Sequence, residues 1–375
     1  MSKKNNHDSL EARLVALTRD LMLIPSIPSR PEDRQKAFEV IKNHLESLRH
    51  LEVVEYEDNG IPSLVAMPKG ITKPKILMCG HIDVIEHEDV SSYRSHIENG
   101  RIYGPGAGDM KGAIAILLEI FRYIHIQSPK ASLGIAITSD EETGGESGIG
   151  FLVNKKGLRA HKAMIPDGGS LNHVTIEEKG ILHLKVSCKG KSAHSARPWF
   201  GVNPIEEMMD KLVYLKTSFK VMQENREKDD KWYPTCAVTM LGTENKQINR
   251  IPCDASAILD VRFPAPYTVK KMRKHIKEIL GENMRMDIII SAEPTRLSPD
   301  NEYKKVIQEV TGQPTVLVRD DGASDARFFS MKDIPVMISR PLVGNLHTTD
   351  EWINIESMVT FYKIYEKYLT KVLLK

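Results

Sequence analysis

Short apolar runs that alternate with helical segments dominate the first half of the chain. Apolar runs at 51–56, 63–67, 75–79 and 133–138 have the length of buried strands, and the segment 113–124 has the length of a helix. That helical segment is apolar on almost every face, which is typical of a helix packed onto a sheet. The alternation therefore predicts a layered α/β domain.

The pattern changes near Gly180. From there to about Ile290 the predicted elements follow the order β-α-β-β-α-β, which is that of a ferredoxin-like unit. The α/β pattern then resumes and ends in a helix that begins near Glu356. We therefore expect a discontinuous first domain with a mixed sheet, formed by 1–179 and 291–375, and a second domain, 180–290, inserted into it.

Composition and charge argue against several classes of protein. The 52 Lys and Arg residues nearly balance the 50 Asp and Glu residues, so the chain lacks the positive bias that nucleic acid or a membrane surface would favour. The first residues lack the apolar stretch of a signal peptide, and no apolar run approaches the roughly 20 residues of a membrane span. The four cysteines lie far apart without a CxxC motif, so neither disulfides nor a cysteine zinc site is indicated. We expect a cytoplasmic protein without a nucleic-acid or membrane partner.

Residues that bind hard metal ions stand at the ends of the apolar runs. His81 and Asp83 follow one such run, and the period-2 alternation of a strand puts both side chains on one face. The carboxylate can then hold the second imidazole nitrogen, which is how histidine ligands of metals are oriented. Taken alone, His81 could equally be a hydrogen-bonded histidine at the end of a strand.

Glu141 and Glu142 follow another apolar run, in an acidic turn that is rich in glycine. Neighbouring side chains of an extended segment point in different directions. One of the two carboxylates can therefore bind a metal while the other faces a water molecule as a general base.

Asp109 lies in a glycine-rich turn directly before the apolar helix. Glycines permit a tight turn, and a carboxylate at this place could bridge two cations. The alternative is an aspartate that caps the helix N-terminus. A nucleotide site is not indicated, because GxGxxG would need glycine where Asp109 stands and a P-loop would need Ser or Thr after its Gly-Lys pair.

Two further candidate ligands complete the set. Asp167 ends another apolar run, and His347 lies in a late polar turn. Oxygen and imidazole ligands without cysteine suit a pair of zinc ions, or cobalt or manganese in their place. The serine-hydrolase motif GxSxG fails at both Ser147 and Ser324, and HExxH fails after His87. The sequence therefore favours a two-metal hydrolase.

These motifs resemble a family of di-zinc metallopeptidases. The family includes succinyl-diaminopimelate desuccinylase, acetylornithine deacetylase, aminoacylase, glutamate carboxypeptidase and carnosinase-type dipeptidases. Its members share a Gly-His-x-Asp strand end, a Gly-Asp-Met-Lys-Gly turn, a Glu-Glu pair, a following Asp or Glu and a late His, in this order. The similarity spans nearly the whole chain.

The resemblance implies roles for the residues at these motifs. It assigns His81 and Asp167 to one metal, Glu142 and His347 to the other, and Asp109 to both. Glu141 would be the general base and Asp83 the residue that orients His81. The resemblance also implies a cis peptide bond between Asp109 and Met110.

The inserted domain resembles the lid or dimerisation domain of this family. Its histidine, His194 here, reaches an active site, often that of the partner subunit, and stabilises the oxyanion. A histidine on a surface loop is the alternative reading of His194. Five further residues match positions that hold a substrate carboxylate or backbone in relatives: Asn249, Arg262, Gly322, Ala323 and Ser324.

The family implies a metal-dependent amide hydrolase that acts on a small peptide or an N-acyl amino acid. Several of its aminopeptidases and dipeptidases carry Asp at the position of Asp167, whereas many of its deacylases and carboxypeptidases carry Glu. We therefore expect a dipeptidase or another exopeptidase, active as a homodimer through the inserted domain. An N-acyl amino acid deacylase of desuccinylase or deacetylase type is the first alternative, although the segment around Ser324 differs from that of the desuccinylase. A non-catalytic binding protein on the same scaffold is the second alternative, and it should have lost a ligand or the base.

Overall fold

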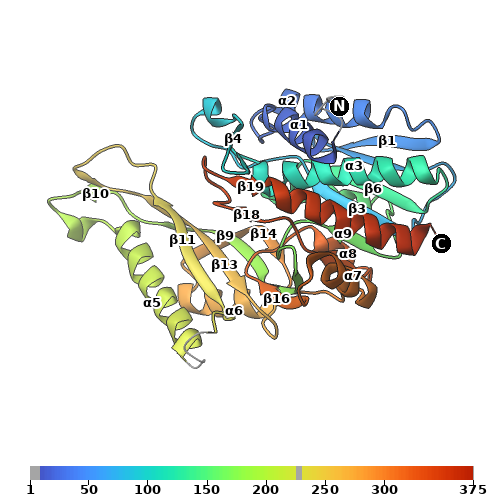
Figure 1. Ribbon diagram of the computed structural model, residues 1–375. Helices are drawn as coiled ribbons and strands as arrows, with labels where there is room; N and C mark the ends of the chain where they lie inside the picture. The colour runs from blue at the N-terminus through green and yellow to red at the C-terminus, as the bar shows by residue number, and fades with distance from the viewer. Residues whose placement is uncertain (1–8, 225–229, 375) are drawn as a thin grey trace. The chain divides into compact units, whose positions relative to one another are not determined.

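The computed structural model describes residues 9–224 and 230–374, which form two compact units (Figure 1). The first unit comprises the described residues up to Ile176, the segment Arg296–Asp320 and the described residues from Ser324 onward. The second unit comprises Glu177–Thr295 together with the short segment Asp321–Ala323. The chain therefore passes between the units more than once.

A large mixed sheet forms the centre of the first unit. Its strands are β1 (Leu51–Asp58), β2 (Ile61–Pro68), β3 (Ile76–His81), β6 (Leu133–Thr138), β7 (Ala163–Ile165), β8 (His173–Glu178), β15 (Thr295–Arg296), β16 (Val316–Asp320) and β17 (Val336–Ile338). They follow the order β1-β2-β6-β3-β7-β17-β8-β15, with β16 paired to β8. The strands β6, β3, β7 and β17 run parallel, whereas β1 and β2 are antiparallel. The mixed α/β fold expected from the sequence is confirmed.

Helices cover both faces of this sheet. One face carries α1 (Leu10–Met22), α2 (Pro31–Leu45), α3 (Gly112–Gln127), α7 (Asn301–Thr311) and α9 (Ile355–Leu373), and the other carries α4 (Ile149–Asn154) and α8 (Ala326–Ser330). The alternation of side chains explains the two cores, because Ile76 and Met78 of β3 face the larger one while Leu77 and Cys79 face the smaller. The apolar helix α3 packs beside α9 and is buried on most sides, as its sequence requires (Figure 1).

A small sheet in the first unit was not predicted from the sequence. Its strands are β4 (His96–Glu98), β5 (Arg101–Tyr103), β18 (Val343–Gly344) and β19 (Trp352–Asn354), in the order β18-β19-β5-β4. Each strand has only two or three residues, too few to show a period of two in the sequence. This sheet joins the turn before α3 to the segment that carries His347.

The turn before α3 is tightly constrained. Residues Ala107–Lys111 form a π-helical turn, and the Asp109–Met110 peptide bond is cis, which confirms the expectation. Gly104 opens the turn with a φ of +132°, and a Cβ atom at this position would lie 1.9 Å from the carbonyl oxygen of Arg94. Only glycine fits this position without a shift of the backbone.

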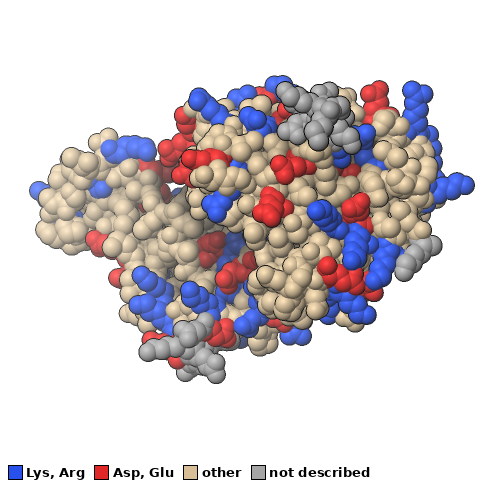
Figure 2. Space-filling view, in the orientation of Figure 1, with Lys and Arg blue, Asp and Glu red and all other residues tan. Residues whose placement is uncertain are grey.

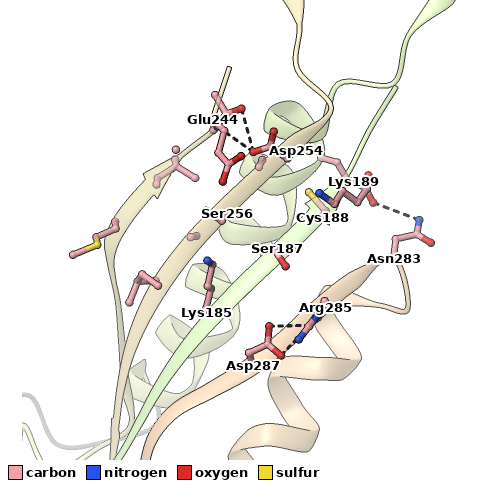
Figure 3. A pocket seen from close by; sticks show the side chains of 18 of the residues that line it. Lys185, Ser187, Cys188, Lys189, Glu244, Asp254, Ser256, Asn283, Arg285 and Asp287 are labelled. Atoms are coloured by element: carbon pink, nitrogen blue, oxygen red, sulfur yellow. Dashed lines mark hydrogen bonds and ion pairs between the residues drawn. The ribbon is translucent and has the colours of Figure 1, made fainter. Parts of the chain in front are cut away.

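The second unit contains an antiparallel sheet with helices on one face. Its elements are β9 (Gly180–Lys189), β10 (Ala193–His194), α5 (Pro204–Glu224), β11 (Thr235–Gly242), β12 (Arg250–Ile251), β13 (Asp254–Phe263), α6 (Val269–Leu280) and β14 (Met284–Ala292). The main strands follow the order β11-β13-β9-β14, and α5 and α6 bury its apolar face. The opposite face carries a hollow of ≈ 1100 Å³, whose lining includes Lys185, Ser187 and Ser256 and the ion pair of Arg285 with Asp287 (Figure 3).

The surface carries charges of both signs, as the balanced composition predicts. Figure 2 shows Lys and Arg side chains interspersed with Asp and Glu side chains on one face of the molecule. Across residues 9–224 and 230–374, none of the helices combines the length and the apolar character that crossing a membrane needs. The cysteines Cys79, Cys188, Cys236 and Cys253 are all free thiols.

Candidate active site

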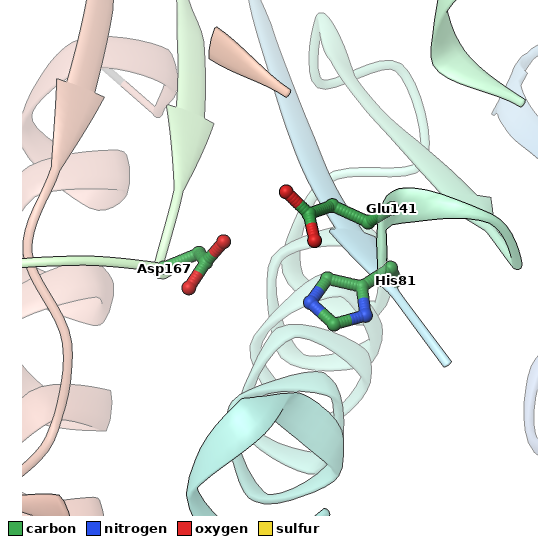
Figure 4. Close-up of side chains that lie close together, drawn as sticks. All are labelled: His81, Glu141 and Asp167. Atoms are coloured by element: carbon green, nitrogen blue, oxygen red, sulfur yellow. The ribbon is translucent and has the colours of Figure 1, made fainter. Parts of the chain in front are cut away.

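Three side chains converge at the carboxyl ends of neighbouring parallel strands. His81 is the last residue of β3, Glu141 lies just beyond β6, and Asp167 lies just beyond β7. Parallel strands end at one common edge of the sheet, so residues that follow them meet there. One ligand atom from each of the three lies within 4.8 Å of the others, and the side chains face a common space (Figure 4). We call this set the first triad.

Asp109, Glu142 and His347 form a second triad, whose ligand atoms also lie within 4.8 Å of one another. Asp109 connects the two triads, because its Oδ1 lies 3.2 Å from Nε2 of His81 and its Oδ2 lies 3.3 Å from Nε2 of His347. Each oxygen of this carboxylate thus faces a different triad. The side chain has the position that a bridging ligand needs.

The two neighbouring glutamates belong to different triads, but for another reason than expected. The prediction of an extended segment is wrong, because Glu141–Thr143 form a 3₁₀ turn. A 3₁₀ helix has about three residues per turn, so consecutive side chains point about 120° apart. Glu141 therefore faces His81 and Asp167, while Glu142 faces Asp109 and His347.

Hydrogen bonds fix the orientation of His81. Its Nδ1 lies 3.0 Å from the main-chain oxygen of Asp83 and 3.5 Å from the carboxylate Oδ1 of the same residue. Because the carbonyl can only accept, Nδ1 carries a proton, which leaves Nε2 as the nitrogen that would bind a metal. This buried Nε2 atom faces the Asp109 carboxylate at 3.2 Å and makes no further polar contact among the described residues. The Asp83 carboxylate accepts a hydrogen bond of 3.0 Å from the backbone of Glu142 and so connects the two ligand turns.

The raised pKa values of the carboxyl groups in the site indicate that it needs added positive charge. Burial raises the pKa of Glu141 well above its ordinary value and that of Asp167 to about 6, and neighbouring carboxylates add to both shifts. Burial also raises the pKa of Glu142. Hydrogen bonds to Asp109 and Glu142 raise the pKa of His347 to about 10. Buried carboxylates this close together are costly unless cations neutralise them, and their oxygen and imidazole donors fit divalent ions such as zinc.

Glu351 supports the site and was missed by sequence reasoning. Its Oε1 accepts hydrogen bonds from the backbone nitrogens of Gly108 (2.7 Å) and Asp109 (2.8 Å), and the side chain is only 2% exposed. It thereby holds the turn that presents the Asp109 carboxylate. The only sequence signal is an acidic residue shortly after His347, and nothing in the sequence says which backbone it meets.

Arg327 was also missed, although it holds the turn of the glutamate pair. This buried guanidinium donates hydrogen bonds to the main-chain oxygens of Gly144 and Ser324. Ser324 itself, expected to contact substrate, is 4% exposed, and its Oγ accepts a hydrogen bond of 3.2 Å from the backbone of Ala326 at the start of α8. In this conformation Ser324 is part of the framework beneath the glutamate turn.

The remaining residues expected to contact substrate lie in the second unit. His194 and Asn249 lie close together, because β10 pairs with β12 and the nitrogen of Ser195 donates to the oxygen of Asn249 at 2.9 Å. Both line a small surface hollow of ≈ 290 Å³. Arg262 lies on β13, where its Nε contacts Asp260 at 2.7 Å. Gly322 and Ala323 belong to the short segment that the second unit includes.

Comparison with known proteins identifies relatives of the whole chain. A model of the peptidase family M20/M25/M40 matches residues 77–371. A curated relative, the succinyl-diaminopimelate desuccinylase of Alkalilimnicola ehrlichii, is 26% identical over 81% of this chain and 86% of its own. The family match confirms the resemblance that the sequence motifs indicated.

Two solved structures share the fold. A tripeptidase from Staphylococcus aureus superposes with a TM-score of 0.76 at 19% identity, over 97% of this chain and 99% of its own. The M20 family metallo-carboxypeptidase Sso-CP2 from Sulfolobus solfataricus gives a TM-score of 0.76 at 19% identity, over 95% of this chain and 98% of its own. At these identities the likeness concerns the fold alone.

Proposed function

Because this chain belongs to peptidase family M20/M25/M40, we propose that it is a metal-dependent hydrolase that cleaves amide bonds in small peptides, as a dipeptidase or another exopeptidase. The observation that carries the proposal is the pair of triads with Asp109 between them. Both sets of ligand atoms lie at the carboxyl edge of a parallel sheet, where α/β enzymes bind their ligands. The six residues expected from the sequence as ligands and general base all belong to these two triads, which supports the proposal.

We propose that this site holds two zinc ions per chain. His81 and Asp167 would bind one ion, Glu142 and His347 the other, and Asp109 both. Glu141 also lies within reach of the first ion. We assign it to proton transfer because Asp109 would provide a third ligand on each side. Cobalt and manganese accept the same donors and would substitute for zinc.

The residues of the chain then perform defined steps. When bound, two divalent cations polarise the scissile carbonyl and lower the pKa of a water molecule. Glu141 accepts the proton of this water and returns it to the leaving amine. His194 donates a hydrogen bond to the oxyanion. The backbone nitrogen of Ala196 donates a hydrogen bond of 3.1 Å to Nδ1 of this ring. In the neutral ring the proton is then on Nε2, which is the nitrogen that would donate.

We further propose that the second unit is a ferredoxin-like lid and dimerisation domain. Its edge strand β11 exposes Val238 (47%) and Met240 (68%), and the neighbouring helix α5 exposes Met209, Val213 and Tyr214. An unpaired strand edge beside exposed apolar side chains is suited to pairing with a second copy. A homodimer would let His194 serve the partner subunit's site.

Sedimentation velocity tests this interface. We expect the parent protein to sediment as a dimer and Met240→Lys as a monomer, because the new charge would be buried against its own copy across a two-fold axis. Ile289→Lys is the matched control, since Ile289 is also exposed but lies on β14, at the opposite edge of the sheet. A monomeric parent at micromolar concentration would contradict the interface and remove the basis for His194 acting in the partner.

A deacylase is the second candidate, and a specific observation favours it. The curated relative with 26% identity is a succinyl-diaminopimelate desuccinylase. Against it, Asp167 matches the residue that several peptidases of the family carry. In a deacylase, an N-acyl amino acid would take the place of the peptide in the same site. A non-catalytic binding protein is the third candidate, and the intact ligands and base argue against it.

Metal removal combined with a substrate screen distinguishes these candidates. We expect the purified protein to contain about two divalent ions per chain and to hydrolyse dipeptides. Chelation should abolish hydrolysis, and added zinc should restore it. Cleavage of N-acyl amino acids without cleavage of dipeptides would favour the deacylase. Two bound ions without cleavage of either class would favour the binding protein.

We also propose that the protein acts in the cytoplasm on small molecules, without a nucleic-acid or membrane partner. The free thiols and the interspersed surface charges support this proposal.

A further inference from the structure

Arg340 lies at the same sheet edge as the first triad. Strand β17 runs parallel to β7 with Ile338 opposite Ile165. Two residues further along each strand, the same register brings Arg340 beside Asp167. The distance between Nη1 of Arg340 and Oδ1 of Asp167 is 3.5 Å. A guanidinium thus stands directly beside a proposed metal ligand.

The N–H groups of this guanidinium do not all have hydrogen-bond acceptors. Its side chain is 17% exposed, and its buried Nε has no hydrogen-bond partner among the described residues. The 3.5 Å contact with Asp167 is an ion pair that is longer than an ordinary N–H···O hydrogen bond. A guanidinium without enough acceptors is costly, so its partly exposed side chain is suited to a ligand that brings one.

Two other guanidiniums near the expected substrate contacts are already engaged. Arg327 donates to the main-chain oxygens of Gly144 and Ser324. Arg262, which the family resemblance assigns to substrate, holds Asp260 through contacts of 2.7 and 3.2 Å. Of these three arginines, Arg340 is the one whose donors remain available beside the metal ligands.

We propose that Arg340 binds a carboxylate of the substrate next to the scissile amide, which makes it a specificity-determining residue. A planar guanidinium matches a carboxylate and binds it through two N–H groups. The three carboxylates among the proposed ligands do not fully neutralise two divalent cations, so the loaded site also attracts an anion. This inference rests on the amide hydrolysis proposed above.

The short distance to Asp167 defines the substrate class. An anion held at Arg340 must lie within a few bonds of the carbonyl that reacts at the metal site. The α-carboxylate of the leaving amino acid meets this condition, since it is two bonds from the amide nitrogen. The substrates are therefore dipeptides or N-acyl amino acids with a free α-carboxylate on the residue that leaves.

The test compares Ala-Ala with its C-terminal amide, which lacks the anionic group. We expect Arg340→Met to lower kcat/KM for Ala-Ala roughly 10- to 100-fold, the worth of hydrogen bonds between charged groups, and to leave that for the amide nearly unchanged. Arg340→Lys should restore part of the loss, because it keeps the charge but not the planar fork. The exposed Arg49 provides the matched control, Arg49→Met, which should leave both substrates unaffected.

Binding and metal content complete the test. In the Glu141→Gln background, calorimetry of the zinc-loaded protein should show that Arg340→Met weakens binding of Ala-Ala and not of its amide. Equal losses for both compounds, loss of zinc from the Arg340 variant, or selective loss in Arg262→Met instead, would overturn the inference. A parent that hydrolyses neither compound would contradict the proposed function, while the binding arm would still decide the role of Arg340.

Discussion

Glu141→Ala is expected to lower kcat about 10²–10⁴-fold while the protein retains two divalent ions per chain. The expected loss is the usual contribution of a general base to the rate. The two measurements are steady-state hydrolysis of dipeptides and metal analysis of the purified variant by atomic emission. Because Glu141 lies within 4.8 Å of His81 and Asp167, the metal analysis is the decisive part.

Glu142→Ala is the matched control for this prediction. Its side chain belongs to the triad of Asp109 and His347, so its removal should release one ion as well as activity. If Glu141→Ala loses an ion and Glu142→Ala does not, the roles of the two glutamates are exchanged. Undiminished activity of Glu141→Ala would exclude it as the base.

Glu351→Leu should produce the second largest effect, a loss of at least one bound ion and of most hydrolysis. Leucine fills a similar space but accepts no hydrogen bond, so the buried nitrogens of Gly108 and Asp109 would lose their acceptor. Each unsatisfied group costs about 1–3 kcal/mol, which the turn relieves by moving the Asp109 carboxylate away from the bridging position. The measurements are metal content, hydrolysis and the free energy of unfolding in urea.

Glu351→Gln separates this positioning role from a need for negative charge. Its amide oxygen can still accept from both nitrogens, so metal content should stay near that of the parent. Equal metal loss in the Leu and Gln variants would show that the charge of Glu351 matters more than its hydrogen bonds. Full metal content in Glu351→Leu would show that the turn holds its shape without this acceptor.

Sequence reasoning located the first triad because its residues depend on local patterns. His81 ends an apolar run and Asp167 follows another, so the sequence alone predicts both as strand-end residues. Parallel strands end at one edge, which brings such residues together without further information. Glu141 was found for the same reason, although the backbone of its turn is helical and not extended.

The supporting residues could not be found in this way because their partners are distant in the sequence. Glu351 meets Gly108 across 243 positions, and no local pattern records that contact. The position of Arg340 depends on the register between β17 and β7, which only the assembled sheet defines. The small sheet was missed because its strands are too short to show periodicity.

The small sheet also distinguishes the two triads by how far apart in the chain their residues lie. The first triad comes from β3, β6 and β7, which pair with each other directly or through β3, within one continuous stretch of the chain. The second triad needs His347, which lies between β18 and β19, and β19 pairs with the distant strand β5. The proposed site of one cation therefore draws most of its ligands from the central strands, while that of the other also depends on a distant part of the chain. Since a ligand that binds only the folded state stabilises it, an ion bound by the second triad would also stabilise the small sheet.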